Sequence, residues 1–80
     1  MAIELKLPAV SADMEYGTIN RWLKSEGDRV AQDEPVVEVE ADKVTVEIEA
    51  PAAGVLARIV AAEGDEIKVG ATMAIIDEGA

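Results

Sequence analysis

Apolar and polar residues alternate one by one along much of this chain. In residues 3–7 three aliphatic residues alternate with Glu4 and Lys6, and the same alternation runs through residues 37–40 and 44–50. A period of two is the signature of a β-strand that buries one face, so we predict a strand in each of these segments. One face of each strand is apolar, and the opposite face is mostly acidic.

Shorter apolar segments predict five further strands, at residues 18–23, 29–31, 55–60, 66–68 and 73–77. Turn-forming sequences separate them, including two copies of Glu-Gly-Asp. About eight short strands in 80 residues indicate an all-β fold, a small sandwich or flattened β-barrel in which both halves of the chain share one core.

The two halves of the chain resemble each other in sequence. Residues 17–30 align with residues 54–67 at an offset of 37, with glycine, arginine, Glu-Gly-Asp and the apolar positions coinciding. The preceding strands, residues 3–8 and 46–51, align at an offset of 43, so the first half has about six extra residues between its two blocks. Such a repeat predicts two interlocked copies of one strand-turn-strand unit, related by a pseudo-twofold axis.

Three single residues have structural interpretations. Gly27 and Gly64 occupy matching places in the two Glu-Gly-Asp turns, and we predict that both need a positive φ. Trp22 falls within a predicted strand, and we expect it to be buried or half-buried, with contact to a partner as the alternative.

Composition excludes most forms of catalysis by the chain itself. Eighty residues form one small domain, residues 1–80, too small for a large active-site cleft. The sequence contains no Cys and no His. Disulfides, a thiol nucleophile, a Cys-based metal site and the usual nucleophile-base pairs are therefore excluded. We expect any catalytic chemistry to be imported.

The charge balance argues against two classes of partner. The net charge is −10, and the only aromatic residues are Tyr16 and Trp22. Nucleic acids and anionic membranes both require clustered Lys and Arg, so we expect neither as a partner. No segment approaches the roughly 20 apolar residues of a membrane-spanning helix, and the first residues lack a signal pattern. We expect a soluble, intracellular protein.

One lysine lies at the predicted tip of a central hairpin, in the sequence Glu-Ala-Asp-Lys-Val of residues 40–44. If Asp42 and Lys43 are the two central turn residues, the facing pairs are Ala41–Val44, Glu40–Thr45, Val39–Val46, Glu38–Glu47 and Val37–Ile48. The pairing places apolar residues opposite one another. It also sets Glu38 against Glu47, at a cost of up to about 1 kcal/mol. An ordinary exposed turn lysine remains an open interpretation from these residues alone.

At these residues the chain resembles a lipoyl domain, the swinging-arm module of dihydrolipoamide acyltransferases in 2-oxo acid dehydrogenase complexes. The resemblance covers essentially all 80 residues. In that family a Glu-x-Asp-Lys motif crowns a hairpin, and its lysine is joined to lipoic acid through an amide; here that lysine is Lys43. The matching positions associated with modification are Gly27, Glu40, Asp42, Val44 and Gly54.

The resemblance implies a flattened β-barrel of two four-stranded antiparallel sheets, with the lipoyl-lysine on a hairpin turn at one end. It also implies that the longer loop between the first two strands, here called the first loop, helps a partner dehydrogenase to recognise its carrier. The first loop comprises Ala9, Val10, Ser11, Ala12, Asp13, Met14 and Glu15. A tolerated surface insertion is the alternative interpretation of this loop.

The function implied by the resemblance is that of a carrier without its own active site. A thiamine diphosphate-dependent dehydrogenase would reductively acylate lipoyl-Lys43, the acyl group would pass to coenzyme A at an acyltransferase catalytic domain, and dihydrolipoamide dehydrogenase would reoxidise the arm. A lipoate ligase or octanoyltransferase would attach the lipoic acid. We expect the isolated domain to be monomeric, in the cytoplasm of a bacterium or archaeon or in the mitochondrial matrix of a eukaryote.

Two other functions stay open at this point. A biotinyl carrier domain of a carboxylase has a similar fold, but its turn resembles Ala-Met-Lys-Met, whereas Asp42 and Val44 flank the lysine here. An unmodified all-β interaction module is the second alternative. Within the lipoyl family, Ser11-x-x-Met14-x-x-Gly17 resembles pyruvate- and acetoin-type domains, while Asp-Lys-Val resembles 2-oxoglutarate or branched-chain types. We favour the pyruvate or acetoin type.

Overall fold

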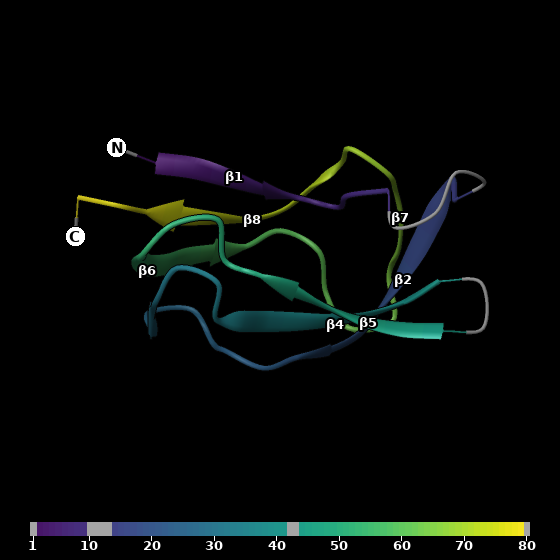
Figure 1. Ribbon diagram of the computed structural model, residues 1–80, viewed down its shortest axis with the longest axis horizontal. Helices are drawn as coiled ribbons and strands as arrows, with labels where there is room; N and C mark the ends of the chain where they lie inside the picture. The colour runs from purple at the N-terminus through teal and green to yellow at the C-terminus, as the bar shows by residue number, and fades with distance from the viewer. Residues whose placement is uncertain (1, 10–13, 42–43, 80) are drawn as a thin grey trace.

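The computed structural model describes residues 2–9, 14–41 and 44–79, and this part of the chain forms two β-sheets (Figure 1). Its eight strands are β1 (Ala2–Lys6), β2 (Tyr16–Trp22), β3 (Arg29–Val30), β4 (Pro35–Ala41), β5 (Val44–Glu49), β6 (Gly54–Ile59), β7 (Glu66–Lys68) and β8 (Thr72–Asp77). All eight predicted strands are present. Their ends differ from the predicted ends by at most two residues, and no described segment is helical.

The two sheets interlock the two halves of the chain. One sheet has the order β1-β8-β6-β3 and the other the order β5-β4-β2-β7, with antiparallel pairing throughout. Replacing each strand of the first order by its repeat partner, β1 by β5 and so on, yields the second order. The predicted pseudo-twofold relation and the two four-stranded antiparallel sheets are therefore confirmed.

Equivalent hydrogen bonds explain why Glu-Gly-Asp occurs twice, at residues 26–28 and 63–65. In each copy the glutamate accepts a bond from a strand of the other half, and the aspartate accepts one within its own turn. The bonds run from Trp22 N–H to Glu63 (3.1 Å), Ile59 N–H to Glu26 (2.8 Å), Ser25 N–H to Asp28 (2.8 Å) and Ala62 N–H to Asp65 (2.9 Å). The predicted positive φ is confirmed at Gly27 (93°) and Gly64 (89°).

The core lies between the two sheets and is formed by aliphatic residues together with Met73. Its buried members are Leu5, Leu7, Ile19, Val30, Val36, Val37, Val39, Ile48, Ala50, Leu56, Ala61, Met73, Ala74 and Ile76. Each fully buried large aliphatic side chain contributes about 1.5–3 kcal/mol relative to an exposed one. Within the described part of the chain no polar or charged residue is buried.

The burial of Val36 departs from the simple alternation of the sequence, and Trp22 has a specific hydrogen-bond partner. Val36 and Val37 are both fully buried although they are neighbours, because the register between β4 and β5 shifts between Pro35 and Val37. Trp22 is half-buried, as predicted, at the end of β2. Its indole N–H donates a hydrogen bond of 2.8 Å to the carbonyl of Ala61. This bond satisfies the polar edge of a ring that otherwise packs against the core.

Candidate attachment site at the β4–β5 hairpin

The β4–β5 hairpin has the predicted register. Ala41 pairs with Val44, Glu40 with Thr45, Val39 with Val46, Glu38 with Glu47 and Val37 with Ile48. Only Asp42 and Lys43 separate the last described pair in sequence, and both lie outside the described residues. The stem therefore presents a two-residue connection that contains the candidate lysine.

Strand β5 becomes more exposed toward the end where β4 and β5 are joined. Along the inward face of β5, Ile48 is 6% exposed, Val46 is intermediate and Val44 is 54% exposed. Figure 1 shows this end of β4 and β5 extending beyond β1, β8 and β6 of the facing sheet. Val44, on the apolar face of β5, is therefore exposed. Among the described residues, Ala41 in the last pair is buried (4% exposed) while its partner Val44 is open to solvent, so a covalent group attached next to Val44 fits the site.

The outer face of the stem is acidic. The predicted Glu38–Glu47 pair is present, and Glu40 is exposed beside Thr45. Arg21 on β2 donates a hydrogen bond of 2.8 Å to the Glu38 carboxylate, which forms an ion pair with it. Glu38 is the less exposed partner, with 18% of its side chain accessible. This ion pair offsets part of the repulsion between the two facing glutamates.

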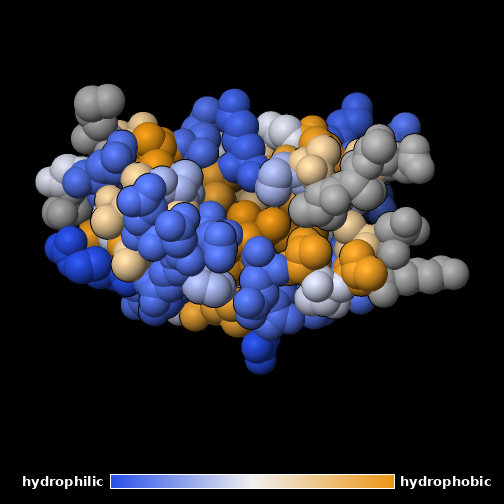
Figure 2. All heavy atoms as spheres, in the orientation of Figure 1, coloured by the Kyte–Doolittle hydropathy of each residue, from blue (hydrophilic) through white to orange (hydrophobic). Residues whose placement is uncertain are grey.

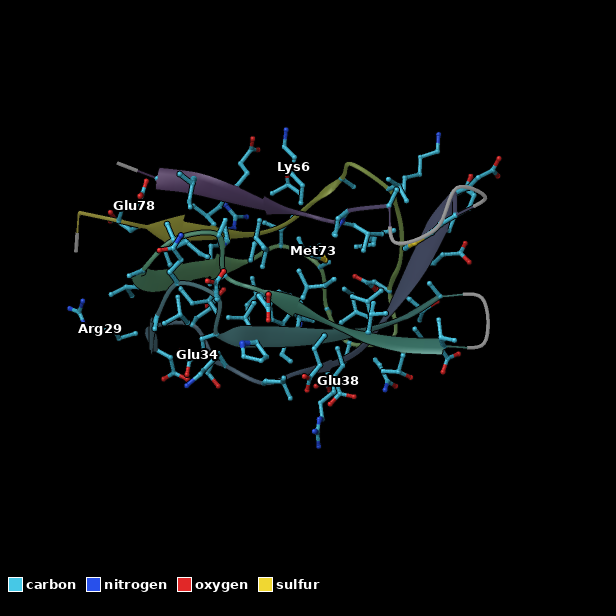
Figure 3. The ribbon with its side chains drawn as sticks, viewed as in Figure 1. Lys6, Arg29, Glu34, Glu38, Met73 and Glu78 are labelled. Carbon is cyan, nitrogen blue, oxygen red and sulfur yellow. The ribbon has the colours of Figure 1, made fainter. Side chains whose placement is uncertain are left out.

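Two predicted recognition glycines lie away from the hairpin. Gly54 starts β6 and pairs with Val30, next to Arg29, and Figure 3 shows Arg29 at the opposite end of the molecule from the joined ends of β4 and β5. Gly27 lies two residues before Arg29 and donates its N–H to the Leu56 carbonyl (2.8 Å). Both glycines have local structural roles. The structure thus brings Glu40 and Val44 together at the hairpin, but places Gly27 and Gly54 elsewhere.

The first loop is described only at its ends. Val10, Ser11, Ala12 and Asp13 lie outside the described residues, whereas Ala9 and Glu15 are exposed and Met14 is partly buried against the core. The sequence motif Ser11-x-x-Met14-x-x-Gly17 includes Gly17, which lies in β2 where the side chain of Met14 packs, but sequence reasoning did not predict this packing. The available signal for this packing was the nearby segment of about six extra residues in the first half of the chain.

Other surface features lie beside the edge strands. A hollow of about 400 Å³ opens between β1 and β5, with Glu4 and Glu47 among its lining residues, and one of about 420 Å³ is lined by Glu15, Tyr16, Lys68 and Val69. Figure 2 shows hydrophobic atoms gathered near the middle of one face within a largely hydrophilic surface. Among the described residues no group of acidic side chains is placed to hold a metal ion. The same residues include no helix long and apolar enough to cross a membrane.

These features define a class of protein: a small all-β domain of two symmetry-related four-stranded sheets, with a lysine in the sequence that joins its halves. The family described as "Biotin-requiring enzyme" (Biotin_lipoyl) matches residues 3–76, so the chain belongs to this biotin/lipoyl family. The individual proteins to which it is similar include dihydrolipoyllysine-residue acyltransferase components and a solved lipoyl domain.

Two relatives and one solved structure illustrate this. The chain is 42% identical, over all of its length and 20% of the relative, to the succinyltransferase component of the 2-oxoglutarate dehydrogenase complex of Bartonella vinsonii subsp. berkhoffii. It is 53% identical, over 94% of its length and 14% of the relative, to acetyltransferase component 3 of the mitochondrial pyruvate dehydrogenase complex of Arabidopsis thaliana. The solution structure of the lipoyl domain of the 2-oxoglutarate dehydrogenase complex from Azotobacter vinelandii has a TM-score of 0.79 at 38% identity, covering 98% of this chain and 99% of that one.

These comparisons confirm the predicted family and fold. The chain spans at most about a fifth of the length of these curated relatives. Both the pyruvate and the 2-oxoglutarate type occur among them, so the relatives do not distinguish the two substrates.

Proposed function

We propose that Lys43 carries lipoic acid through an amide bond and that the domain carries acyl groups between the enzymes of a 2-oxo acid dehydrogenase complex. The observation that carries the proposal is the hairpin register. Ala41 and Val44 are paired, so the two residues between them connect the strands where the facing sheet has ended. A lysine in a two-residue connection of a lipoyl-type domain is the natural attachment point for a mobile arm.

Lys43 would hold the lipoyl group, which would supply acyl-accepting and redox chemistry. The proposed partners are a thiamine diphosphate-dependent dehydrogenase, an acyltransferase catalytic domain that uses coenzyme A, and dihydrolipoamide dehydrogenase. The chain's own contribution is positional. Its paired strands β4 and β5 hold the attachment point on a rigid stem, which raises the local concentration of a tethered group at each partner. We propose no active site within the chain, whose sequence has neither Cys nor His.

A pyruvate- or acetoin-type complex is our preferred context. The support is the sequence Ser11-x-x-Met14-x-x-Gly17 at the first loop. A cytoplasmic location in a bacterium or archaeon, or the mitochondrial matrix in a eukaryote, completes the proposal. The plant relative is itself named as mitochondrial.

Modification by a lipoate ligase or octanoyltransferase is the direct test. The chain would be incubated in parallel with a lipoate ligase plus lipoate and with a biotin ligase plus biotin, then analysed by intact mass and peptide mapping. We expect one lipoyl group, on Lys43, and none on the other lysines, Lys6, Lys24 and Lys68. Lys43→Gln should abolish the mass increase and Lys68→Gln should not.

The two alternative functions give different results in this assay. Biotin on Lys43 would identify a biotinyl carrier, although Asp42 and Val44 differ from the Ala-Met-Lys-Met turn of that class. Modification by neither ligase would refute the carrier function and leave an unmodified interaction module.

A further inference from the structure

The hollow between β1 and β5, which we call the seam groove, is lined by matching residues of the two halves of the chain. The repeat relates them at the offset of 43 that aligns the first strands of the two halves. The matching pairs are Glu4 with Glu47, Leu5 with Ile48, Lys6 with Glu49 and Pro8 with Pro51. Each half therefore supplies one wall, and the pseudo-twofold axis passes through the groove.

Both walls are edge strands, because β1 and β5 each stand last in the strand order of a sheet. The main-chain groups along an open edge can accept a further strand, and proteins discourage this with short edge strands, lysine and irregular pairing. The other two edges, β3 and β7, have only two and three residues. Strand β1 has Lys6 and a register shift beside it. Strand β5 has six residues without Lys, Pro or Gly, so it is the edge most open to a further strand.

Apolar residues form part of the lining of the seam groove. Leu5, Ile48 and Ala50 are buried members of the core that reach the groove. The hydrophobic atoms near the middle of the face in Figure 2 lie between β1 and β5 as Figure 1 draws these strands. An extended segment placed here would therefore cover apolar surface as well as an open strand edge.

The β5 wall is acidic, and its charges are uncompensated within the described part of the chain. Glu47 and Glu49 are exposed and lie two residues apart, so they share one face of β5. Neither carboxylate takes part in a hydrogen bond or ion pair among the described residues. Glu4 on the β1 wall differs, because it accepts a bond from the Thr72 hydroxyl (2.9 Å) and lies 3.8 Å from the Lys6 ammonium.

Asp33 brings a third carboxylate to the seam groove. Its φ is 67°, the only positive φ among the described residues other than glycine. Continuing the offset of 37 aligns it with Gly70, whose φ is 90°. A side chain is disfavoured in this conformation, which glycine adopts freely. The first half thus has a carboxylate at the groove where the second half has no side chain.

We propose that the seam groove binds an extended, positively charged peptide segment of a partner protein, which pairs with the free edge of β5 and places Lys or Arg side chains against Glu47, Glu49 and Asp33. Strand addition is a general mode of peptide recognition, in which main-chain hydrogen bonds supply affinity and side chains supply specificity. Charge selects the partner. A second copy of this chain, with a net charge of −10 and glutamates along the same edge, is repelled. A cationic segment is attracted at each carboxylate.

The first test titrates the ¹⁵N-labelled 80-residue chain with the peptide acetyl-Lys-Val-Lys-Val-Lys-Val-amide and follows the amide signals by two-dimensional NMR. The salt concentration is low, about 0.05 M, so that screening is weak. We expect saturable shifts at residues 4–8, 33 and 44–50, and none at β3 or β7. Acetyl-Lys-Pro-Lys-Pro-Lys-Pro-amide has the same charges but is a poor strand former, because proline lacks an N–H. Equal affinity of the two peptides, or no shifts at the groove, would overturn the proposal.

The second test compares variants with the same loss of charge. Glu47→Gln/Glu49→Gln should bind the Lys-Val peptide about tenfold more weakly, and Asp33→Gly about threefold, since each exposed ion pair contributes a factor of up to about five. Glu66→Gln/Glu78→Gln is the matched control, because neither residue lines the groove. It should bind like the wild type, and an equal loss of affinity in both double variants would overturn the site in favour of attraction by net charge alone. Neither test uses Lys43 or lipoic acid, so a failure here leaves the proposed carrier function unaffected.

Discussion

Replacing Gly54 by alanine should destabilise the domain strongly, by a purely structural mechanism. The added Cβ would lie 2.5 Å from the carbonyl oxygen and 3.0 Å from the carbonyl carbon of Asp77, and 3.0 Å from Ile76 Cγ2. Two of these three atoms belong to the main chain of β8, which cannot rotate away as a side chain can. The strand itself has to move, although it pairs with both β1 and β6.

The expected cost follows from this geometry. Overpacking of a rigid site costs typically 1–3 kcal/mol, and a backbone contact belongs at the upper end, about 3 kcal/mol. A domain of 80 residues has a total stability of about 4–12 kcal/mol. With a urea m-value of about 1 kcal/mol/M for a small domain, the unfolding midpoint should fall by about 3 M.

Urea titration followed by far-UV circular dichroism and by the fluorescence of Trp22, the single tryptophan, measures this shift. Gly27→Ala is the matched control: its Cβ meets nothing within 4 Å, and its φ is +93°, so only the left-handed backbone cost of about 1–2 kcal/mol applies. A Gly54→Ala midpoint at or above that of Gly27→Ala would refute the steric argument. The folded Gly54→Ala protein should also be lipoylated at the wild-type rate, because Gly54 lies far from the hairpin.

Three further changes test other contacts. Asp33 has a left-handed backbone (φ 67°), so Asp33→Gly should leave stability unchanged or raise it by up to about 1 kcal/mol in urea titration; a loss above 1 kcal/mol would contradict this. A hydrogen bond from the Ala31 N–H holds the pKa of Glu34 below its ordinary value of 4.5. The stabilisation from ionised Glu34 is therefore present above that value and lost as the pH falls through the lowered pKa. Glu34→Gln should make the free energy of unfolding depend less steeply on pH in the acid range. An unchanged dependence would contradict the assignment. Arg21→Ala should cost about 0.5–1 kcal/mol through loss of its ion pair with Glu38, less in 1 M salt than in 0.05 M; equal losses at both would contradict an electrostatic origin.

The strands and the register of the β4–β5 hairpin were predictable because each depends on local sequence. A one-residue slip of the hairpin would turn every apolar side chain of β5 to the wrong face, so the alternation fixes the register from Val37–Ile48 to Ala41–Val44. The repeat predicts two symmetry-related units, but the order of the strands within each sheet came from the structure. The consecutive burial of Val36 and Val37 was not predictable, because it depends on an irregularity in pairing that the alternation does not record.

The site was predictable only in part. Motif spacing identified the hairpin and the first loop, but spacing along a chain says nothing about distance in space. Gly27 and Gly54 match family positions in sequence, yet they lie at the end of the molecule away from the joined ends of β4 and β5. Conversely, the packing of Met14 on Gly17 depends on three side chains from separate segments, and no local pattern encodes such a junction.

The repeat also determines where the hairpin lies relative to the first and last strands. The two units are related by a pseudo-twofold axis and follow each other along the chain. The connection between them therefore lies at one end of the molecule, and the first strand begins and the last strand finishes at the opposite end. In Figure 1, β1 starts and β8 finishes at the end opposite the join of β4 and β5, and Ala2 pairs with Asp77 there. The long dimension of the molecule is 36 Å, against 20 and 17 Å for the others. A tether attached at either of these strands would therefore leave the paired ends of β4 and β5 at the far end of the domain, which is the geometry that a carrier visiting several partners requires.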